Sequence, residues 1–199
     1  DYAITYRLSD KGLHIETTAT TDQDTLFAYT NHAYFNLDES DSILDHTLMI
    51  PTDHYALLDE TCLTKPEFHA VENTAFDFRQ AKKIGKDINQ DAIQLVYGKG
   101  YDHHFPIPGE GLRTMAILSD GKLELEMASD YPGFHLYTAN WLNGAIGKNG
   151  HHYGERSSVC LEAEYLPNGI NYPHIEPKPI IRVGETQKHH IDFLVRHVK

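Results

Sequence analysis

The chain has 199 residues, of which 40% are hydrophobic and 11% aromatic, so it is long and apolar enough to bury a core. Its formal net charge is −12 and it has no basic stripe, which argues against a nucleic-acid partner, because phosphate binding needs clustered Lys and Arg. No apolar run approaches the roughly 20 residues of a membrane helix, which excludes a spanning role.

The cysteines indicate a reducing compartment. The sequence has two, Cys62 and Cys160, whereas a small secreted fold held by disulfides usually has more. The first residues, Asp1-Tyr-Ala-Ile4, contain neither the basic nor the apolar part of a signal peptide. We therefore expect reduced thiols and a cytoplasmic location.

Alternation of apolar and polar residues recurs along the chain, whereas helical periodicity is scarce. Residues 2–8 and 12–18 predict two strands, joined by a hairpin turn at residues 9–12. Ser119-Asp-Gly121 predicts a second hairpin turn. Further strands are predicted at residues 25–29, 44–50, 114–118, 122–127, 133–138, 158–163 and 187–194. Gly85 interrupts the modest helical character of residues 81–95, which favours a loop with a short turn.

The fold class predicted from this order of elements is all-β. Strands outnumber helices and no βαβ alternation occurs, so we expect a large, mainly antiparallel sandwich in one domain over residues 1–199. The chain lacks a starting Met and opens inside a strand-like alternation, so we expect the domain to be incomplete at its N-terminus. The polar connection at residues 143–154 is long enough to predict a functional loop.

The run from Thr30 to Leu37 has polar side chains at every second position. His32, Tyr34 and Asn36 share one face of an extended chain, and Phe35 lies on the other. Hydrogen-bonding side chains in a row resemble the lining of a polar pocket. A histidine that is hydrogen-bonded in a turn is the alternative reading.

Residues 158–163 and the glutamate after them show the same pattern. Val159 and Leu161 point to one face, and Cys160, Glu162 and Glu164 point to the other. The apolar face fits a core. The second face places Glu162 either in a lined cleft or in water.

Two further segments carry polar side chains that suit a sugar. Asp102 follows Gly98-Lys-Gly100, and glycines let a loop approach a ligand closely. Its carboxylate is able to accept hydrogen bonds from hydroxyls or to cap a turn. His135 and Tyr137 share a face of the strand that follows Tyr131-Pro-Gly133.

A metal site is not predicted, although the chain has 14 histidines. The adjacent pairs at residues 103–104, 151–152 and 189–190 point to opposite faces of an extended chain and chelate poorly. Neither a His-Glu-x-x-His motif nor a paired Cys-x-x-Cys motif occurs. Nucleotide-binding glycine motifs and the Gly-x-Ser-x-Gly elbow are also absent, so we expect no cofactor.

Five motifs together resemble those of the aldose 1-epimerases, also called galactose mutarotases. In the family's order they are Asn31-His-Ala-Tyr-Phe-Asn-Leu37, Thr74-Ala-Phe-Asp-Phe-Arg79, Gly100-Tyr-Asp-His103, Pro132-Gly-Phe-His-Leu-Tyr-Thr138 and Cys160-Leu-Glu162. The resemblance runs from the first strands to the last. It implies a β-supersandwich fold.

The resemblance also implies a function, the interconversion of the α- and β-anomers of a free hexose such as galactose or glucose, without cofactor or metal. His32 matches the family's general acid, which protonates the ring oxygen. Glu162 matches its general base, which takes the proton from the C1 hydroxyl. Asp102 matches a residue that binds sugar hydroxyls, and we assign His135, Tyr34 and Asn31 to substrate binding as well.

This chain departs from the family pattern in two places. The family has an N-terminal part that ends in His-Gly-Gly and a substrate-binding arginine, and neither is present here. We therefore expect this chain to be the C-terminal portion of a longer enzyme, whose second histidine and arginine complete the site, and activity of these 199 residues alone is not assured. In addition, many members have Gln where this chain has His135, which leaves the preferred hexose open.

Two other functions remain as alternatives. An epimerase of hexose 6-phosphates would favour basic residues near the cleft, and this acidic chain offers few. A carbohydrate-binding or regulatory module would keep the sugar pocket without turnover. The presence of both His32 and Glu162 favours catalysis over the module.

Overall fold

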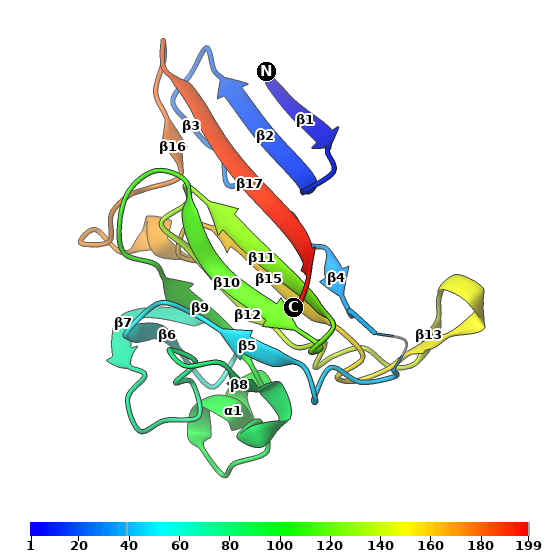
Figure 1. The fold of residues 1–199 in the computed structure, drawn as a ribbon. Coiled ribbons are helices and arrows are strands. Elements are labelled where there is room, and N and C mark those ends of the chain that lie inside the picture. The colour runs from blue at the N-terminus through cyan, green and yellow to red at the C-terminus, as the bar shows by residue number, and fades with distance from the viewer. Residues whose placement is uncertain (39, 199) are drawn as a thin grey trace.

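Antiparallel strands are the main secondary structure of the computed structural model, which describes residues 1–38 and 40–198 (Figure 1). The largest sheet has seven strands, which confirms the all-β prediction. In spatial order they are β1 (Tyr2–Leu8), β2 (Gly12–Thr20), β17 (Thr186–His197), β11 (Leu123–Ser129), β10 (Arg113–Ser119), β5 (Thr47–Met49) and β8 (Lys82–Lys83).

A four-stranded antiparallel sheet packs against the larger one. In spatial order its strands are β4 (Tyr34–Phe35), β15 (Val159–Glu164), β12 (Gly133–Tyr137) and β9 (Asp102–Pro106). Strands far apart in sequence therefore become neighbours, since β15 pairs with β4 on one side and with β12 on the other.

Short elements connect these sheets. The two-stranded ladders are β3 (Thr25–Leu26) with β16 (Ile180–Ile181), β6 (His54–Leu58) with β7 (Thr64–Ala70), and β13 (Ala145–Ile146) with β14 (His152–Tyr153). The helices are α1 (Ile93–Gly98) and the 3-10 turns η1 (Ile84–Lys86), η2 (Lys148–Gly150) and η3 (Gly169–Asn171). None of these helices is long and apolar enough to cross a membrane.

Both predicted hairpin turns are confirmed. The Ser9 N–H donates to the carbonyl of Gly12 at 2.9 Å, which closes the turn between β1 and β2. Between β10 and β11, one carboxylate oxygen of Asp120 accepts the N–H groups of Lys122 and Leu123. Gly121 has a φ of +89°, a conformation that glycine adopts without steric cost.

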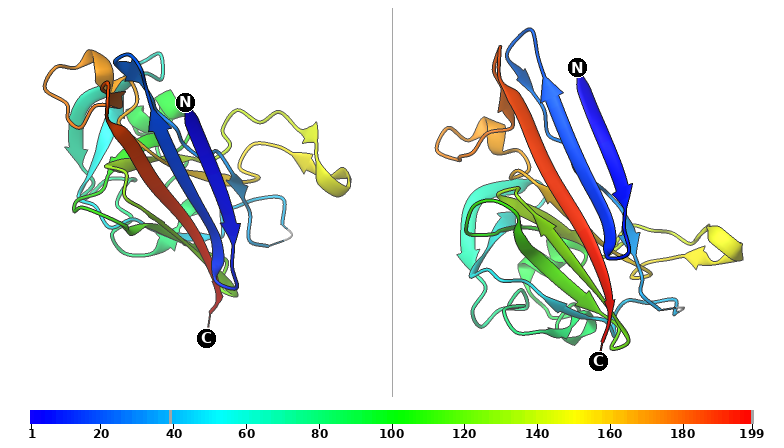
Figure 2. Two further views of the ribbon diagram at one scale, coloured as in Figure 1. Left: turned by 90° about the horizontal axis from the view of Figure 1, so that it is seen from above. Right: turned by 45° about the horizontal axis from the view of Figure 1, so that its top comes forward.

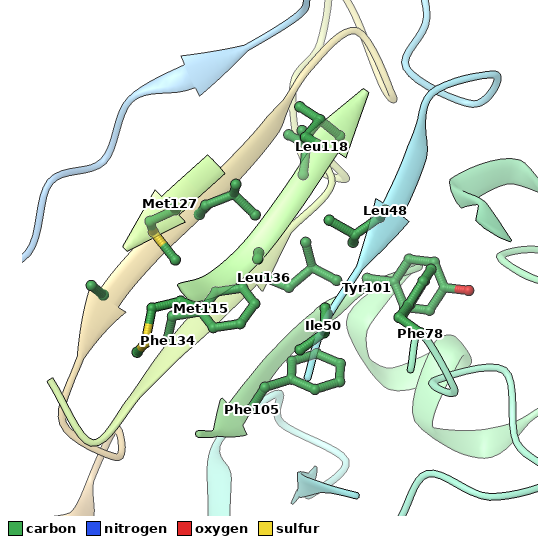
Figure 3. Packing of buried hydrophobic residues seen from close by; sticks show 14 of the residues in the cluster. Leu48, Ile50, Phe78, Tyr101, Phe105, Met115, Leu118, Met127, Phe134 and Leu136 are labelled. Carbon is green, nitrogen blue, oxygen red and sulfur yellow. The ribbon is translucent and has the colours of Figure 1, made fainter. Parts of the chain in front are cut away.

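The hydrophobic core lies between the two sheets (Figure 3). Alternation on β12 directs Phe134 and Leu136 toward β10 and β11, which contribute Met115, Leu118 and Met127. All five side chains are fully buried. Burying a side chain of this size contributes about 1.5–3 kcal/mol to folding, so this layer fixes the position of β12.

We expect Leu136→Ala to lower the free energy of unfolding by about 2–5 kcal/mol, because it leaves a cavity in a close-packed layer. Urea unfolding followed by circular dichroism measures this change. Leu8→Ala is the matched control, since Leu8 is 82% exposed on β1, and it should change stability by no more than about 0.5 kcal/mol. Equal losses in the two variants would contradict the assignment of Leu136 to the core.

Two predictions of local structure need correction. The strand predicted at residues 25–29 is confined to β3, and the loop predicted at residues 81–95 contains β8, η1 and the start of α1. Tertiary contacts hold this six-residue helix in place: the Gln94 side chain accepts the N–H of Leu58 at 2.7 Å and donates to its carbonyl at 3.1 Å.

The segment predicted as a long polar loop, residues 143–154, is instead the β13–β14 hairpin. Both views of Figure 2 show it projecting away from the two sheets. Ile146, at 74% exposed, and Tyr153, at 39%, lie on it.

Candidate functional site

The outer face of the four-stranded sheet collects the chemistry-bearing side chains. The register places His104, His135 and Glu162 directly across from one another on β9, β12 and β15. Because side chains at alternate positions share a face, the next row on the same face is Asp102, Tyr137, Cys160 and Tyr34. The side chains on the opposite face pack in the core. Alternation along each strand therefore places the core residues and the site residues on different faces of the sheet.

A pocket of about 370 Å³ opens on this face. The residues that line it are His32, Tyr34, Asp102, His135, Tyr137, Glu162, Glu164 and Pro167. A second cleft of about 630 Å³ surrounds Arg79 and Lys82. Its volume is larger, but those two cations are already paired with Asp77 and Asp87 at 2.8 and 2.6 Å. We therefore place the candidate site in the smaller pocket, where polar groups converge.

His32 and Glu162 face each other in this pocket. His32 Nε2 lies 3.4 Å from Glu162 Oε1, and the histidine side chain is half exposed whereas the glutamate is 7% exposed. Burial raises the pKa of Glu162 to about 7, and the charge of His135 partly opposes this shift. The carboxyl group therefore changes its protonation state near neutral pH, as a general base requires.

The segment that carries His32 is held from both sides. The Asn31 side-chain oxygen accepts the Ala33 N–H at 3.2 Å, and the Asn36 side chain donates to the carbonyl of Ser157 at 3.0 Å. The His32 ring stacks on Tyr34 with ring centres 5.1 Å apart. These contacts orient the imidazole although only residues 34–35 of the run form a strand.

Asp102 and His135 form a close pair at the other side of the pocket. His135 Nε2 lies 2.7 Å from Asp102 Oδ1, and the Trp141 indole N–H donates to Asp102 Oδ2 at 3.4 Å. Burial alone would lower the pKa of His135, but the hydrogen bond with Asp102 and the charges of Glu164 and Asp102 outweigh it, so the net shift is upward. The pair therefore presents a carboxylate fixed between two donors.

The loop before Asp102 is fixed by a buried polar network. The Asn140 side chain donates to the carbonyls of Gly98 and Tyr101 at 2.7 and 2.9 Å, and the guanidinium of Arg156 bonds Asn140 and the Lys99 carbonyl. A Cβ at Gly100, whose φ is +134°, would lie 2.6 Å from that guanidinium. Gly100 thus makes room for Arg156, not for a ligand as its position before Asp102 suggested.

The pocket brings together five of the six site residues predicted from the sequence, His32, Tyr34, Asp102, His135 and Glu162. The sixth, Asn31, is not among the lining residues. Three lining residues were not assigned to the site: Tyr137, Glu164 and Pro167. For the first two a signal existed, since each lies two positions from an assigned residue on the same strand face.

One group of side chains in the described part of the chain has the composition of a metal site. The donor atoms of His32, Cys160 and Glu162 all lie within 4.8 Å of one another. Burial, followed by the charges of Glu162 and Asp102, raises the pKa of the Cys160 thiol. A thiol that keeps its proton is a poor metal ligand, which disfavours a metal at this position.

Comparison with known proteins identifies the family. A sequence model described as aldose 1-epimerase matches residues 1–194. An aldose 1-epimerase from Haemophilus influenzae is 35% identical over 179 residues, which cover 87% of this chain and 52% of that protein. A galactose mutarotase from Homo sapiens is 34% identical over 193 residues, covering 94% and 54%. The chain thus spans about half the length of these relatives.

Solved structures agree with this assignment. A GalM/aldose epimerase homologue from C. elegans superimposes with a TM-score of 0.87 at 30% identity, over 98% of this chain and 59% of that one. A galactose 1-epimerase from Lactobacillus acidophilus gives a TM-score of 0.86 at 29% identity, over 100% and 57%. These matches confirm the predicted mutarotase-like sandwich. By sequence and by fold, this chain belongs to the aldose 1-epimerase family.

Proposed function

We propose that the protein interconverts the α- and β-anomers of a free hexose, galactose or glucose, by general acid–base catalysis. The observation that carries this proposal is the placement of His32 Nε2 and Glu162 Oε1 3.4 Å apart in one pocket. The two oxygens that exchange protons in the reaction, the ring oxygen and the C1 hydroxyl, are bonded to the same carbon. An acid and a base that serve them must therefore lie close together.

The reaction follows from these positions. Glu162 takes the proton of the C1 hydroxyl while the protonated His32 donates its proton to the ring oxygen, so the bond between C1 and the ring oxygen breaks and an aldehyde forms. Rotation about the C1–C2 bond presents the other face of the aldehyde. On reclosure the hydroxyl oxygen at C5 attacks C1 and its proton returns to His32, while Glu162 gives its proton to the carbonyl oxygen, which becomes the C1 hydroxyl again. No electrons enter or leave, and this sequence of steps requires no cofactor.

The remaining predicted site residues are assigned to sugar binding. Asp102, fixed between His135 and Trp141, accepts hydrogen bonds from sugar hydroxyls. Tyr34 supplies an aromatic face beside His32. Asn31 contributes indirectly, because its side-chain oxygen accepts the Ala33 N–H and so holds the backbone on either side of His32. Free Cys62 and Cys160 support a cytoplasmic location for the protein.

Polarimetry tests the proposal. Freshly dissolved α-D-galactose or α-D-glucose should approach its equilibrium rotation faster with the full-length protein than with buffer alone. Sugar binding by calorimetry without any change in that rate would favour the binding module instead. Among the described residues that line the pocket there is no Lys or Arg, so this part of the site does not favour a phosphorylated hexose as the substrate.

We expect kcat to fall below pH 7 about tenfold for each pH unit, because Glu162, whose pKa burial raises to about 7, must be ionised to act as the base. Above that pH this group no longer limits the rate. Initial rates of mutarotation between pH 5 and 8, corrected for the rate in buffer, measure the profile. A kcat that stays constant over this range would contradict the assignment of the base.

A further inference from the structure

Glu164 has no part in the proton transfers described above, although it lines the pocket. Its Oε1 lies 3.9 Å from Nδ1 of His104 and 3.9 Å from Nδ1 of His135. Both nitrogens are buried, and neither has a hydrogen-bond partner among the described residues. A carboxylate in such surroundings is unfavourable unless a proton resides on one of the two imidazoles.

Gly133 allows this cluster to form. It pairs with Glu164 on β15 and with Pro106 on β9, so it lies between these two neighbours of β12 at this level of the sheet. A Cβ at Gly133 would stand 2.5 Å from His104 Nε2 and 2.5 Å from the carbonyl oxygen of Phe105. The His104 ring therefore occupies the space that a side chain on β12 would fill.

The pKa values of the two imidazoles shift in opposite directions. For His104, burial is the largest effect and lowers the pKa, and the charge of His135 lowers it further, while Glu164 only partly opposes them. For His135, the neighbouring carboxylates overcome burial and the net shift of the pKa is upward. The titratable groups facing His135 from the adjacent strands are Asp102 and His104 on β9, and Glu162 and Glu164 on β15, while the charge interaction with His103 acts from the core side of β9.

Only the charged form of His135 presents an N–H to each of its carboxylate neighbours, to Asp102 within hydrogen-bonding distance and to Glu164 at 3.9 Å. In the neutral ring with the proton on Nε2, the lone pair of Nδ1 faces Glu164. In the other neutral tautomer, the lone pair of Nε2 faces Asp102 at 2.7 Å, and the contact that orients Asp102 is lost. The imidazolium donates from Nε2 to Asp102 and directs its Nδ1–H toward Glu164.

We propose that Glu164 is a positioning residue that holds His135 as an imidazolium and thereby fixes Asp102 for sugar hydroxyls, so that sugar affinity depends on pH. This inference rests on the proposed function only in naming the sugar. It extends that function, because it explains why sugar affinity falls at high pH. The cause is the loss of a proton from His135, in a cluster that takes no part in the proton transfers at C1. Proton transfer by Glu162 and substrate binding through Asp102 then have separate pH dependences.

The first experiment is a pH titration of the histidine side chains by NMR on the 15N-labelled full-length protein. We expect His135 to be mostly imidazolium at pH 6.5, and its titration midpoint to move to lower pH in Glu164→Gln. Glu126→Gln is the matched control, because Glu126 on β11 is 19% exposed in its side chain and Glu164 is 21% exposed. It should leave the midpoint unchanged.

An unchanged midpoint in Glu164→Gln, or a neutral His135 at pH 6.5 in the unmodified protein, would overturn the proposal. The second result needs no variant, so it decides the matter even if Glu164→Gln does not fold. Neither readout requires catalysis. A protein without mutarotase activity would therefore refute the proposed function and leave this test intact.

Kinetics supply a second readout. We expect KM to rise about tenfold as His135 loses its proton, in line with the loss of a hydrogen bond to a charged group, and to rise at lower pH in Glu164→Gln. At pH 8, where Glu162 is ionised, kcat should change less than threefold. In His135→Gln, KM should no longer rise with pH, because the residue that loses the proton is gone. If KM rises with pH in that variant as it does in the unmodified protein, the proposal is overturned.

Discussion

Replacing Glu162 by Gln should slow mutarotation by about 10²–10⁴-fold, because the amide has nearly the shape of the carboxyl group but does not accept the C1 proton. The side chain is 9% exposed, so bulk water does not readily take over the role of the base. We expect the loss in kcat, with KM changed much less. Polarimetry at pH 8, where the unmodified carboxyl group is ionised, measures it.

The same substitution should leave the protein at least as stable. The pKa of Glu162 is raised from its usual 4.5 to about 7, so the folded state loses stability as pH rises between these values, and the loss persists above pH 7. A neutral amide removes that penalty, worth up to about 3 kcal/mol at pH 8. Urea unfolding should therefore show an inactive but stable protein. A rate loss smaller than threefold would remove Glu162 from the role of base, and an unfolded variant would refute the account of its burial.

Glu126→Gln serves here too as the control for loss of a carboxylate. Glu126 accepts the hydroxyl of Thr114 at 2.5 Å and pairs with Arg196 on the larger sheet, away from the pocket. It should keep its full rate. A comparable loss of rate in both variants would show that the effect of Glu162→Gln comes from general changes in charge or stability.

The sequence was informative wherever alternation decides the structure. Period-2 patterns predicted the strands around Leu136 and Glu162, and they separated the core face of β15 from the face that carries Cys160 and Glu162. The helical periodicity of α1 was too short to recognise in the sequence, because six residues span fewer than two turns. The helix depends instead on the hydrogen bonds between the Gln94 side chain and the Leu58 backbone.

The site was predicted in part for the same reason. Alternation and the family motifs supplied the residues nearest the proton transfers, but the cluster around Glu164 depends on long-range register. His104 approaches Glu164 only because β9 and β15 flank β12 at a glycine. Nothing in the local sequence of any one strand specifies that neighbourhood. Similarly, the role of Gly100 is visible only once Arg156 is placed against it.

Replacing His32 by Asn should reduce the rate by at least about 10²-fold, because the amide is able to hydrogen-bond to the ring oxygen but not to protonate it. The imidazole is half exposed and its neighbours are held by their own contacts, so the free energy of unfolding should change by no more than about 0.5 kcal/mol. The expected result is therefore a loss of kcat in a protein of unchanged stability. Polarimetry and urea unfolding on the same preparation measure the two quantities.

The matched control is His190→Asn. His190 on β17 is 41% exposed, and its Nδ1 lies 3.7 Å from a carboxylate oxygen of Glu16, so it too is a partly exposed histidine paired with a glutamate. His190 lies on the larger sheet, whereas His32 lines the pocket. Full activity in His190→Asn and loss in His32→Asn would assign the effect to the pocket. A loss of rate below threefold in His32→Asn would contradict the role of His32 as the acid. Water, which enters an open site, would then protonate the ring oxygen, and of His32 and Glu162 only Glu162 would be needed for catalysis.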